Sequence, residues 1–390
     1  MSDLHLRVKL VAFRDAGPDF LDRSKKRLAD LFPGLYFSFV DGEADLLFFA
    51  SGGSEREAVD SLDKERYCLL LADRYDNAYA AATEVMAWVN RNGFSASLYS
   101  IDRAGKEGIM PLYARALEAR KALTGQKAAL VGNISHWLVA SSVPAETFKK
   151  VLGIELLQLD WDVLPDVLSM PAHKEFLETF TGQMEKGLEA EARIHGFLKH
   201  IIREHSLQGV SPECFTMVKE RDVTACLSLA LLNSQGIAAA CEGDLVSLAG
   251  MMVMKALTGR IPWMANVAMV EENRVLFAHC TAGLDLVDNA SYPTHFETDR
   301  SAALRAEIQM EEVTVFRFSQ DLDSAFVSEG KVIGRPGHHF ACRTQVEVDL
   351  PETALFRLRD APLGNHHLLI PGRQKALIDC FLRLLQPPGA

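Results

Sequence analysis

The sequence predicts an α/β protein with two open α/β (Rossmann-like) domains, followed by a mostly antiparallel, β-barrel-like C-terminal domain. Apolar strand-like runs alternate with amphipathic helix-like runs over about the first hundred residues, and the alternation then starts again. Such alternation is typical of a parallel sheet covered by helices on both faces. After about residue 260 the runs become short, rich in Val, Phe and Thr, and separated by turns, which is typical of antiparallel sheet. We expect domain boundaries at 1–112, 113–258 and 259–390.

The first domain is predicted from strands and helices in strict alternation. Expected strands lie at 7–13, 44–50, 66–72 and 95–101, and expected helices at 19–32, 55–62 and 76–93. Asp76 or Asn77 is a suitable N-cap for the third helix, and Gly93 a suitable C-terminal stop. The run "SGGSE" at 51–55 follows a strand and could cradle a phosphate at a helix N-terminus, or simply begin the helix.

The second and third domains are predicted from the same patterns. In the second, strands are expected at 127–134, 154–160 and 237–245, and helices at 110–125, 144–153, 173–206, 223–236 and 247–259. In the third, strands are expected at 274–282, 312–319, 324–334, 344–350 and 366–372, before a closing helix at about 372–386.

Composition and charge narrow the class of function. The chain has 390 residues, 48% of them hydrophobic and 24% charged, with a formal net charge of −11. A negative balance argues against non-specific nucleic-acid binding, which needs a basic surface. No charge-free apolar run of about 18 residues predicts a membrane span, and the N-terminal "MSDLHLRVKLVAF" is more typical of a strand than of a signal peptide. We therefore expect a cytoplasmic protein that binds a small polar molecule or a cation.

The chain has 7 cysteines, scattered and without a CxxC pair. This distribution argues against a disulfide framework or a zinc ribbon, and indicates reduced thiols in a cytoplasm. Cys241 and Cys280 flank the candidate site described next, and we interpret both as small residues that fill the core.

Two carboxylates stand at the strand-to-helix junction "AACEGDLVSLAG". Glu242 and Asp244 lie at the carboxyl end of the expected strand, where open α/β sheets bind ligands. A buried charge is costly unless it is paired or holds a metal. The alternative is structural, with Asp244 capping the next helix and Glu242 paired with a basic neighbour.

Further polar residues could complete a metal site with Glu242. Asn266 ends the apolar run "IPWMAN", His279 stands in the apolar "LFAHCTA", and His366 and His367 stand at the mouth of an expected strand. Adjacent strand residues face opposite sides, so at most one of the last two points into a given site. Oxygen ligands with one or two imidazoles suit Mn²⁺, Mg²⁺, Fe²⁺ or Co²⁺. A histidine in an apolar strand can instead be a core residue.

Other charged residues are candidates for substrate contact. Lys219, Glu220 and Arg221 stand in a charged segment expected to be a loop, which could bind substrate hydroxyls, phosphate or sulfonate, or could simply be solvated. Arg343 follows the pair His338 and His339 and could bind an anionic group, although a turn at a strand entry is an equal alternative.

Several of these segments resemble one family. "CEGDLVSLAGMMVMKALTGRIPWMANV", "VLFAHCTAG" and "LGNHHLLIPG" are similar to the L-fucose isomerase and L-arabinose isomerase superfamily, and most to its fucose isomerase-like members. The N-terminal "ADLLFFASGGSEREAV" and "DNAYAAATEVMAWVNRNG" resemble the first domain of that family. The likeness spans most of the chain in the same order, and implies the same fold of two α/β domains and a barrel-like third.

The resemblance also implies a chemistry. The family converts aldoses to ketoses through an enediol, with a divalent metal, usually Mn²⁺, and with Fe²⁺ or Co²⁺ as alternatives. Glu242 and His366 match metal ligands of the family, and His279 falls near a ligand of the arabinose branch. Asn266 stands where the family has an aspartate, which is a departure, because an amide cannot accept a proton at neutral pH.

The resemblance thus assigns Glu242 and Asn266 as catalytic residues. The expected metal ligands are Glu242, Asn266, His279 and His366, and the expected substrate contacts are Lys219, Glu220, Arg221, Asp244, His367 and Arg343. A sugar is the expected partner, bound by a homotrimer or homohexamer. The alternative is a non-catalytic sugar-binding or regulatory protein on an isomerase scaffold, which the loss of the aspartate favours.

Overall fold

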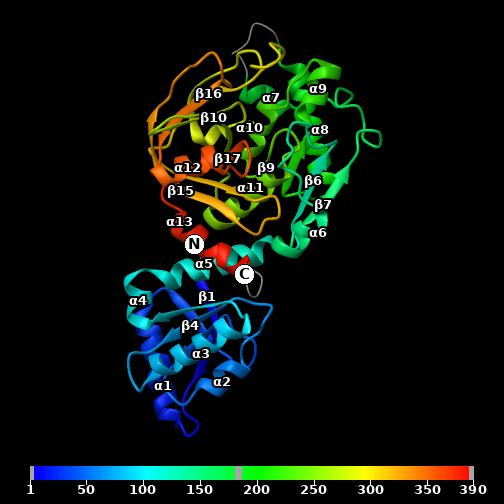
Figure 1. Ribbon diagram of the computed structural model, residues 1–390. Coiled ribbons are helices and arrows are strands. Elements are labelled where there is room, and N and C mark those ends of the chain that lie inside the picture. The colour runs from blue at the N-terminus through cyan, green and yellow to red at the C-terminus, as the bar shows by residue number, and fades with distance from the viewer. Residues whose placement is uncertain (1–3, 181–186, 386–390) are drawn as a thin grey trace. The chain divides into compact units, whose positions relative to one another are not determined.

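The computed structural model describes residues 4–180 and 187–385. The chain falls into two compact units, which we describe separately (Figure 1). Unit 1 comprises Met1–Lys121 and Ala376–Ala390, and unit 2 comprises Ala122–Lys375. The division into three domains stays a prediction. The closing helix, α13 (Lys375–Leu385), belongs almost entirely to unit 1, where Arg383 donates a hydrogen bond of 2.9 Å to the Tyr99 hydroxyl.

Unit 1 is built on a five-stranded parallel sheet of order β2-β1-β3-β4-β5 (Figure 1). Its strands are β1 (Leu4–Val11), β2 (Leu35–Phe39), β3 (Leu46–Phe49), β4 (Cys68–Ala72) and β5 (Ala96–Ser100). Its helices are α1 (Pro18–Leu31), α2 (Glu55–Asp60), α3 (Ala78–Asn92), α4 (Ile101–Lys106) and α5 (Ile109–Leu123). The parallel sheet confirms the predicted α/β class. Strand β2 was not predicted, because it is a short, half-buried edge strand without a continuous apolar run.

Unit 2 begins with a four-stranded parallel sheet of order β7-β6-β8-β9. Its strands are β6 (Lys127–Val131), β7 (Glu155–Leu159), β8 (Gly209–Pro212) and β9 (Ala238–Ala239). The helices are α6 (Ala145–Thr147) with the π-helical η1 (Phe148–Leu152), α7 (Lys174–Thr179), α8 (Glu189–Glu204), α9 (Cys214–Arg221), α10 (Cys226–Ser234) and α11 (Leu245–Thr258). The helix expected over 173–206 is two helices, and 181–186 lie outside the described residues.

The rest of unit 2 is a closed antiparallel barrel of order β10-β11-β16-β15-β14-β17. Its strands are β10 (Trp263–Val270), β11 (Val275–His279), β14 (Glu312–Phe318), β15 (Ala325–Gly334), β16 (Thr344–Asp349) and β17 (His366–Pro371). Beside it lie η2 (Leu284–Leu286), the paired strands β12 (Val287–Ser291) and β13 (Arg305–Ile308), and α12 (Glu352–Asp360). The predicted barrel is thus confirmed, although β10 and α12 were not predicted.

Alternation along β17 decides which side chains enter the barrel. Leu369 packs in the interior cluster with Trp263, whereas Leu368 lies outside against helix α11. A Cβ on Gly250 of that helix would lie 2.6 Å from Leu368 Cδ1, so glycine permits the close approach of helix and strand. Helix α11 is therefore buried against the barrel. Within the described residues, no helix is both long and apolar enough to cross a bilayer.

Candidate active site

The turn between β9 and α11 has an unusual backbone. Glu242 and Gly243 both adopt left-handed conformations, with φ values of 61° and 71°. A Cβ on Gly243 would lie 2.5 Å from the Asn133 carbonyl oxygen, so only glycine fits. A left-handed glutamate is strained, and such residues gather at functional sites. The turn brings Glu242 to the carboxyl edge of the sheet, where the sequence predicted it.

Glu242 faces two histidines of the barrel. Its Oε1 lies 3.8 Å from His279 Nε2 and 3.7 Å from His366 Nε2, and the two imidazole rings are 5.4 Å apart. These distances are too long for direct hydrogen bonds. Two atoms that each bind one ion at about 2.1 Å lie roughly 3–3.6 Å apart. The separations of Glu242 from each histidine come close to those of ligands around a shared ion. The ligand atoms that all lie within 4.8 Å of one another are those of Glu242, His279 and the Cys241 thiol, which the sequence reasoning had taken only as a core residue.

His366 is held in a defined orientation by Asp244. Its Nδ1 lies 2.9 Å from Asp244 Oδ2, and its Nε2 is buried without a hydrogen-bond partner in the described chain. The other Asp244 oxygen, Oδ1, accepts a 2.7 Å bond from the Ser247 amide and caps α11. Asp244 thus performs the predicted capping and also orients an imidazole. A carboxylate behind a histidine is the usual second partner of a metal-binding imidazole.

Arg317 of β14 lies beneath this pair, and the sequence reasoning did not single it out. Its Nη1 donates a 2.7 Å bond to the His366 carbonyl and lies 3.6 Å from Asp244 Oδ2. Only 2% of Arg317 is exposed. Burying an arginine is costly unless an anion compensates for its charge. The signal in the sequence was an arginine between two phenylalanines of an otherwise apolar strand.

The pKa values of the group reflect these contacts. Burial opposes ionisation of Glu242, but the facing His279 and His366 outweigh it and lower the pKa of its carboxyl group. Burial likewise opposes ionisation of Asp244, and His366 and Arg317 lower its pKa. Burial also disfavours the charged form of His366, yet the two carboxylates raise its pKa to about 9. Two ionised carboxylates thus stand beside the Arg317 guanidinium and a protonated His366, so the charges offset one another, and a cation bound at His366 would have to replace its proton.

A loop after β6 covers the group, and it too was missed. Trp137 Nε1 donates a 2.6 Å hydrogen bond to Glu242 Oε2, and the Ser135 amide donates to the Glu242 carbonyl at 3.0 Å. Lys219 Nζ lies 6.0 Å from the centre of the Trp137 indole. Trp137 is 39% exposed, so it borders the site on the solvent side. The sequence could have indicated this loop as part of a site, because it follows the carboxyl end of a strand in a parallel sheet.

Asn266 lies on the same strand face as His366. It is opposite His366 in the pairing of β10 with β17, and residues opposite each other share a face. Its Oδ1 accepts a 2.9 Å hydrogen bond from Asn365 Nδ2. The Asn266 amide is thus already held by a neighbouring side chain.

Two predicted substrate contacts lie elsewhere. His367 points into the barrel, with ring centres 6.3 Å from Phe277 and 5.3 Å from Phe326, and burial lowers its pKa to about 3. Arg343 lies near the segment 294–299, where its Nε donates a 3.0 Å bond to the Thr294 carbonyl. The structure does not bring either residue next to Glu242.

The charged run 219–221 is divided between two places. It forms the end of α9 rather than the expected loop. Lys219 reaches the Trp137 ring, whereas Glu220 and Arg221 line a separate cavity of about 240 Å³ with Trp161. Arg221 is ion-paired there with Asp166 at 2.7 Å. Only Lys219 of the three therefore lies near the candidate site.

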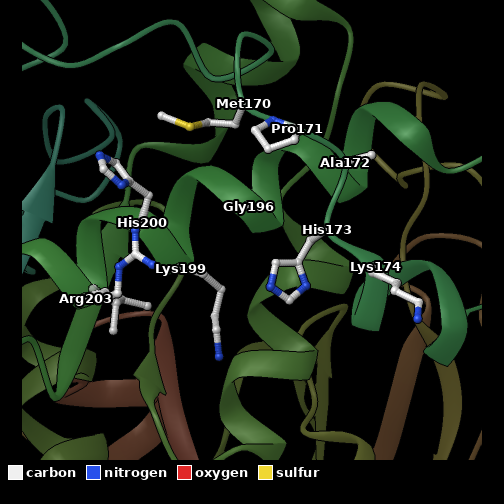
Figure 2. A pocket seen from close by; sticks show the side chains of 10 residues that line it. Met170, Pro171, Ala172, His173, Lys174, Gly196, Lys199, His200 and Arg203 are labelled. Carbon is white, nitrogen blue, oxygen red and sulfur yellow. The ribbon is translucent and has the colours of Figure 1, made fainter.

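A larger cavity lies away from these residues. Figure 2 shows side chains of α8, of the segment before α7 and of the first residue of α7. They line a space of about 660 Å³. Lys199, His200 and Arg203 come from one side, and His173 and Lys174 from the other. None of the predicted site residues lines it, so its size alone does not mark it as the site of the predicted chemistry.

Comparison with known proteins finds similarity to sugar isomerases. No family model matches the chain. Proteins named sulfoquinovose isomerase from Priestia aryabhattai and Priestia megaterium are each 24% identical over 274 residues, or 65% of this chain. A sulfoquinovose isomerase from Alkalicoccus urumqiensis is 28% identical over 96 residues, or 24% of this chain and 22% of that protein. The match spans 61% of the length of each Priestia relative. The predicted likeness to an isomerase is thus supported, without singling out L-fucose isomerase.

Proposed function

We propose that the protein is a metal-dependent aldose–ketose isomerase whose substrate is a sulfonated hexose such as sulfoquinovose. One observation carries the proposal: Glu242 Oε1 faces His279 Nε2 and the unpartnered His366 Nε2 at 3.7–3.8 Å. The named relatives supply the substrate class.

The residues present suit a divalent cation, with Mn²⁺ first and Fe²⁺ or Co²⁺ as alternatives. Glu242, His279 and His366 would hold it, and the free lone pairs of Asn266 Oδ1 could add an oxygen ligand. Such an ion polarises adjacent sugar oxygens and stabilises the negative charge that develops between C1 and C2.

The chain's own residues would move the proton. Glu242 is ionised at neutral pH and could accept a proton from one sugar carbon and return it to the next, while its lowered pKa makes it a weaker base than an ordinary glutamate. Trp137 fixes the carboxylate through Oε2. Asn266 cannot carry a proton, so it would position the sugar or the ion. Asp244 would act through His366, as a positioning residue.

Lys219 is our candidate for the sulfonate. It stands beside Trp137, at the exposed border of the site, in a segment for which the sequence left open either binding of substrate hydroxyls, phosphate or sulfonate or a purely solvated role. An ammonium group attracts a sulfonate as a point charge without requiring a fixed geometry.

Metal content and turnover together test the proposal. The protein is purified from manganese-supplemented culture, its metals are measured by elemental mass spectrometry, and sulfoquinovose and ordinary aldoses are assayed. We expect about one Mn²⁺, Fe²⁺ or Co²⁺ per chain, together with isomerisation, and loss of both in Glu242→Ala. Unchanged turnover in both Glu242→Ala and His366→Ala would reject these roles.

Asn266 favours a second candidate, a sugar-binding protein without catalysis. That candidate predicts that calorimetry detects binding of the sugar while no ketose forms. Asn266→Asp separates the two: it lowers the native turnover of an isomerase adapted to the amide, but creates turnover in a protein that lost its aspartate. Isomerisation by the unmodified protein excludes the second candidate.

A further inference from the structure

A second group of possible metal ligands lies outside the set assigned to the sugar reaction. Sulfur atoms of Cys226 and Cys280 are 3.2 Å apart. One ligand atom from each of Cys226, Cys280 and His295 lies within 4.8 Å of the others, and all three residues are buried. Cys280 was expected only to fill the core, so its surroundings go beyond that expectation.

The three residues come from separate parts of unit 2. Cys226 is the first residue of α10, Cys280 directly follows β11, and His295 lies between β12 and β13. Cys342, just before β16, interacts with the Cys280 thiol through its side chain. Its Sγ also lies 3.6 Å from Glu297 Oε1. Chain segments that are distant in sequence thus bring together ligands of one chemical type.

We propose that Cys226, Cys280 and His295 bind a zinc ion at a site separate from that of the sugar reaction. Sulfur and imidazole ligands select Zn²⁺, and this group offers two thiols and one imidazole. The group at Glu242 offers a carboxylate, the His279 imidazole and only one thiol, that of Cys241, so it is the poorer in sulfur.

Charge balance favours zinc in this buried place. Two thiolates compensate for the charge of Zn²⁺, so the occupied site carries no net charge into the core. Binding would form two Zn–S bonds and one Zn–N bond and release two thiol protons to solvent. The bound cation would thus take the place of the two thiol protons.

His295 has the right form for a ligand. A neutral imidazole binds a metal through one ring nitrogen while the other can hydrogen-bond a neighbouring group. One ring nitrogen lies 3.1 Å from the Thr298 hydroxyl and the other 3.2 Å from Glu297 Oε2. Zinc would replace one of these contacts, and the other would orient the ring.

The site would fix the end of β11. His279, which faces Glu242, is the residue before Cys280. An ion that joins this position to α10 would therefore limit the movement of His279. This role concerns the position of the imidazole and does not require zinc to touch the substrate.

Cobalt serves as the probe, because a Co²⁺–thiolate bond gives a charge-transfer band in the near ultraviolet. The unmodified full-length protein is stripped with chelator under reducing conditions and titrated with Co²⁺, and zinc in the untreated protein is measured by elemental mass spectrometry. We expect about one zinc per chain and a thiolate band that saturates at one cobalt. Absence of both zinc and the band in the unmodified protein would overturn the proposal without any variant.

Substitutions then identify the residues whose thiolates and imidazole bind the cobalt. We expect Cys226→Ala and His295→Gln to weaken cobalt binding at least about tenfold. Cys214→Ser is the matched control, because Cys214 belongs to the other buried thiol pair, 3.1 Å from Cys241. Glu242→Ala should keep the zinc and the band while losing manganese, which separates this proposal from the isomerase assignment. A band that disappears in Cys214→Ser but survives in Cys226→Ala would contradict the assigned ligands.

Discussion

The two parallel sheets place a carboxylate at the same kind of position but surround it differently. In unit 1, Asp73 directly follows β4, and Arg27 lies 2.6 Å from its Oδ2. In unit 2, Glu242 follows β9 and faces the imidazoles of His279 and His366. Both carboxylates are buried, with 1% of Asp73 and 9% of Glu242 exposed.

The two carboxylates differ in whether the basic group beside them can lose a proton. A guanidinium is always charged and has no lone pair to offer, so the Asp73–Arg27 pair is closed to a further cation. Imidazole nitrogens can give up a proton and bind a metal instead. Position at the carboxyl end of a strand therefore locates both residues, and only the partners distinguish a structural carboxylate from a candidate catalytic one.

The largest effect should come from removing the negative charge of each carboxylate. Glu242→Gln keeps the shape but loses the proton acceptor, and we expect kcat/KM to fall by about 10²–10⁴. Asp73→Asn should instead lower the free energy of unfolding by about 1–2 kcal/mol, because a charged hydrogen bond is weakened. Steady-state kinetics and urea unfolding are measured on both variants. Equal loss of activity in the two would remove the distinction.

Asp244→Asn tests whether a carboxylate must stand behind His366. The variant leaves the buried Arg317 without its anion, and breaking such a pair costs about 3–5 kcal/mol of stability. It also weakens the orientation of His366, so we expect the Kd for Mn²⁺ to rise about 10–100-fold. Urea unfolding and metal titration report the two effects. Ser247→Ala serves as the control, because it keeps the backbone amide that Asp244 caps.

His195 extends the comparison to a buried polar group without a partner. Both of its ring nitrogens lack hydrogen bonds within the described residues, and burial, with smaller contributions from His173 and Lys199, lowers its pKa to about 3. The unfolded chain binds a proton near pH 6.5 while the folded chain does not, so stability is full above that pH and falls as pH decreases towards 3. We expect a loss of about 2 kcal/mol between pH 7 and pH 5 from this residue.

His195→Leu should flatten that part of the stability curve. The ring packs against His173 and Phe176, so an apolar side chain suits its surroundings. Urea unfolding at several pH values gives the measurement, with His200→Leu, at a half-buried histidine 3.1 Å from Glu204, as the control. An unchanged slope between pH 7 and pH 5 would show that folding does not lower the pKa of His195.

Trp137→Phe tests the hydrogen bond that fixes the Glu242 carboxylate. Trp137→Phe keeps an aromatic ring beside Lys219 but removes the N–H that donates to Glu242 Oε2. A hydrogen bond to a charged group is worth about 1.5–3 kcal/mol, which corresponds to a loss of roughly 10- to 150-fold in kcat/KM. The unfolding free energy should change little, because Trp137 is partly exposed. A large loss of stability would indicate a structural role instead.

The sequence predicted most of the fold because its patterns are local. The apolar run of β3 and the period of α3 indicate a strand and a helix without knowledge of their neighbours. Strand β8 is only four residues long, and β9 only two, so neither gives a period of its own. The place of β8 in the sheet depends on its pairing with β6, and that of β9 on its pairing with β8, and neither pairing is local.

Only part of the candidate site was predicted, because the sequence shows local patterns but not contacts between distant segments. Glu242, Asp244 and His366 stand at recognisable ends of elements, whereas Arg317 and Trp137 become relevant only through contacts with residues far along the chain. The sequence "SGGSE" at 51–55 in unit 1 allows two interpretations, a phosphate-binding turn or the ordinary start of a helix. In the structure the Ser54 hydroxyl donates to the Ser51 carbonyl at 2.8 Å, at the start of a helix of six residues.

Two adjacent histidines in β17 make the register of this strand in the barrel important. Its residues after His366 and His367 are Leu, Leu and Ile, so both faces carry equivalent side chains, and sliding by a single position would exchange one imidazole for the other at little hydrophobic cost. The choice therefore falls to backbone contacts. Arg317 grips the His366 carbonyl, and a Cβ on Gly364 would collide with that same guanidinium at 2.2 Å. Arg317 thus fixes the register of β17, so that His366 faces Glu242 and the adjacent His367 does not.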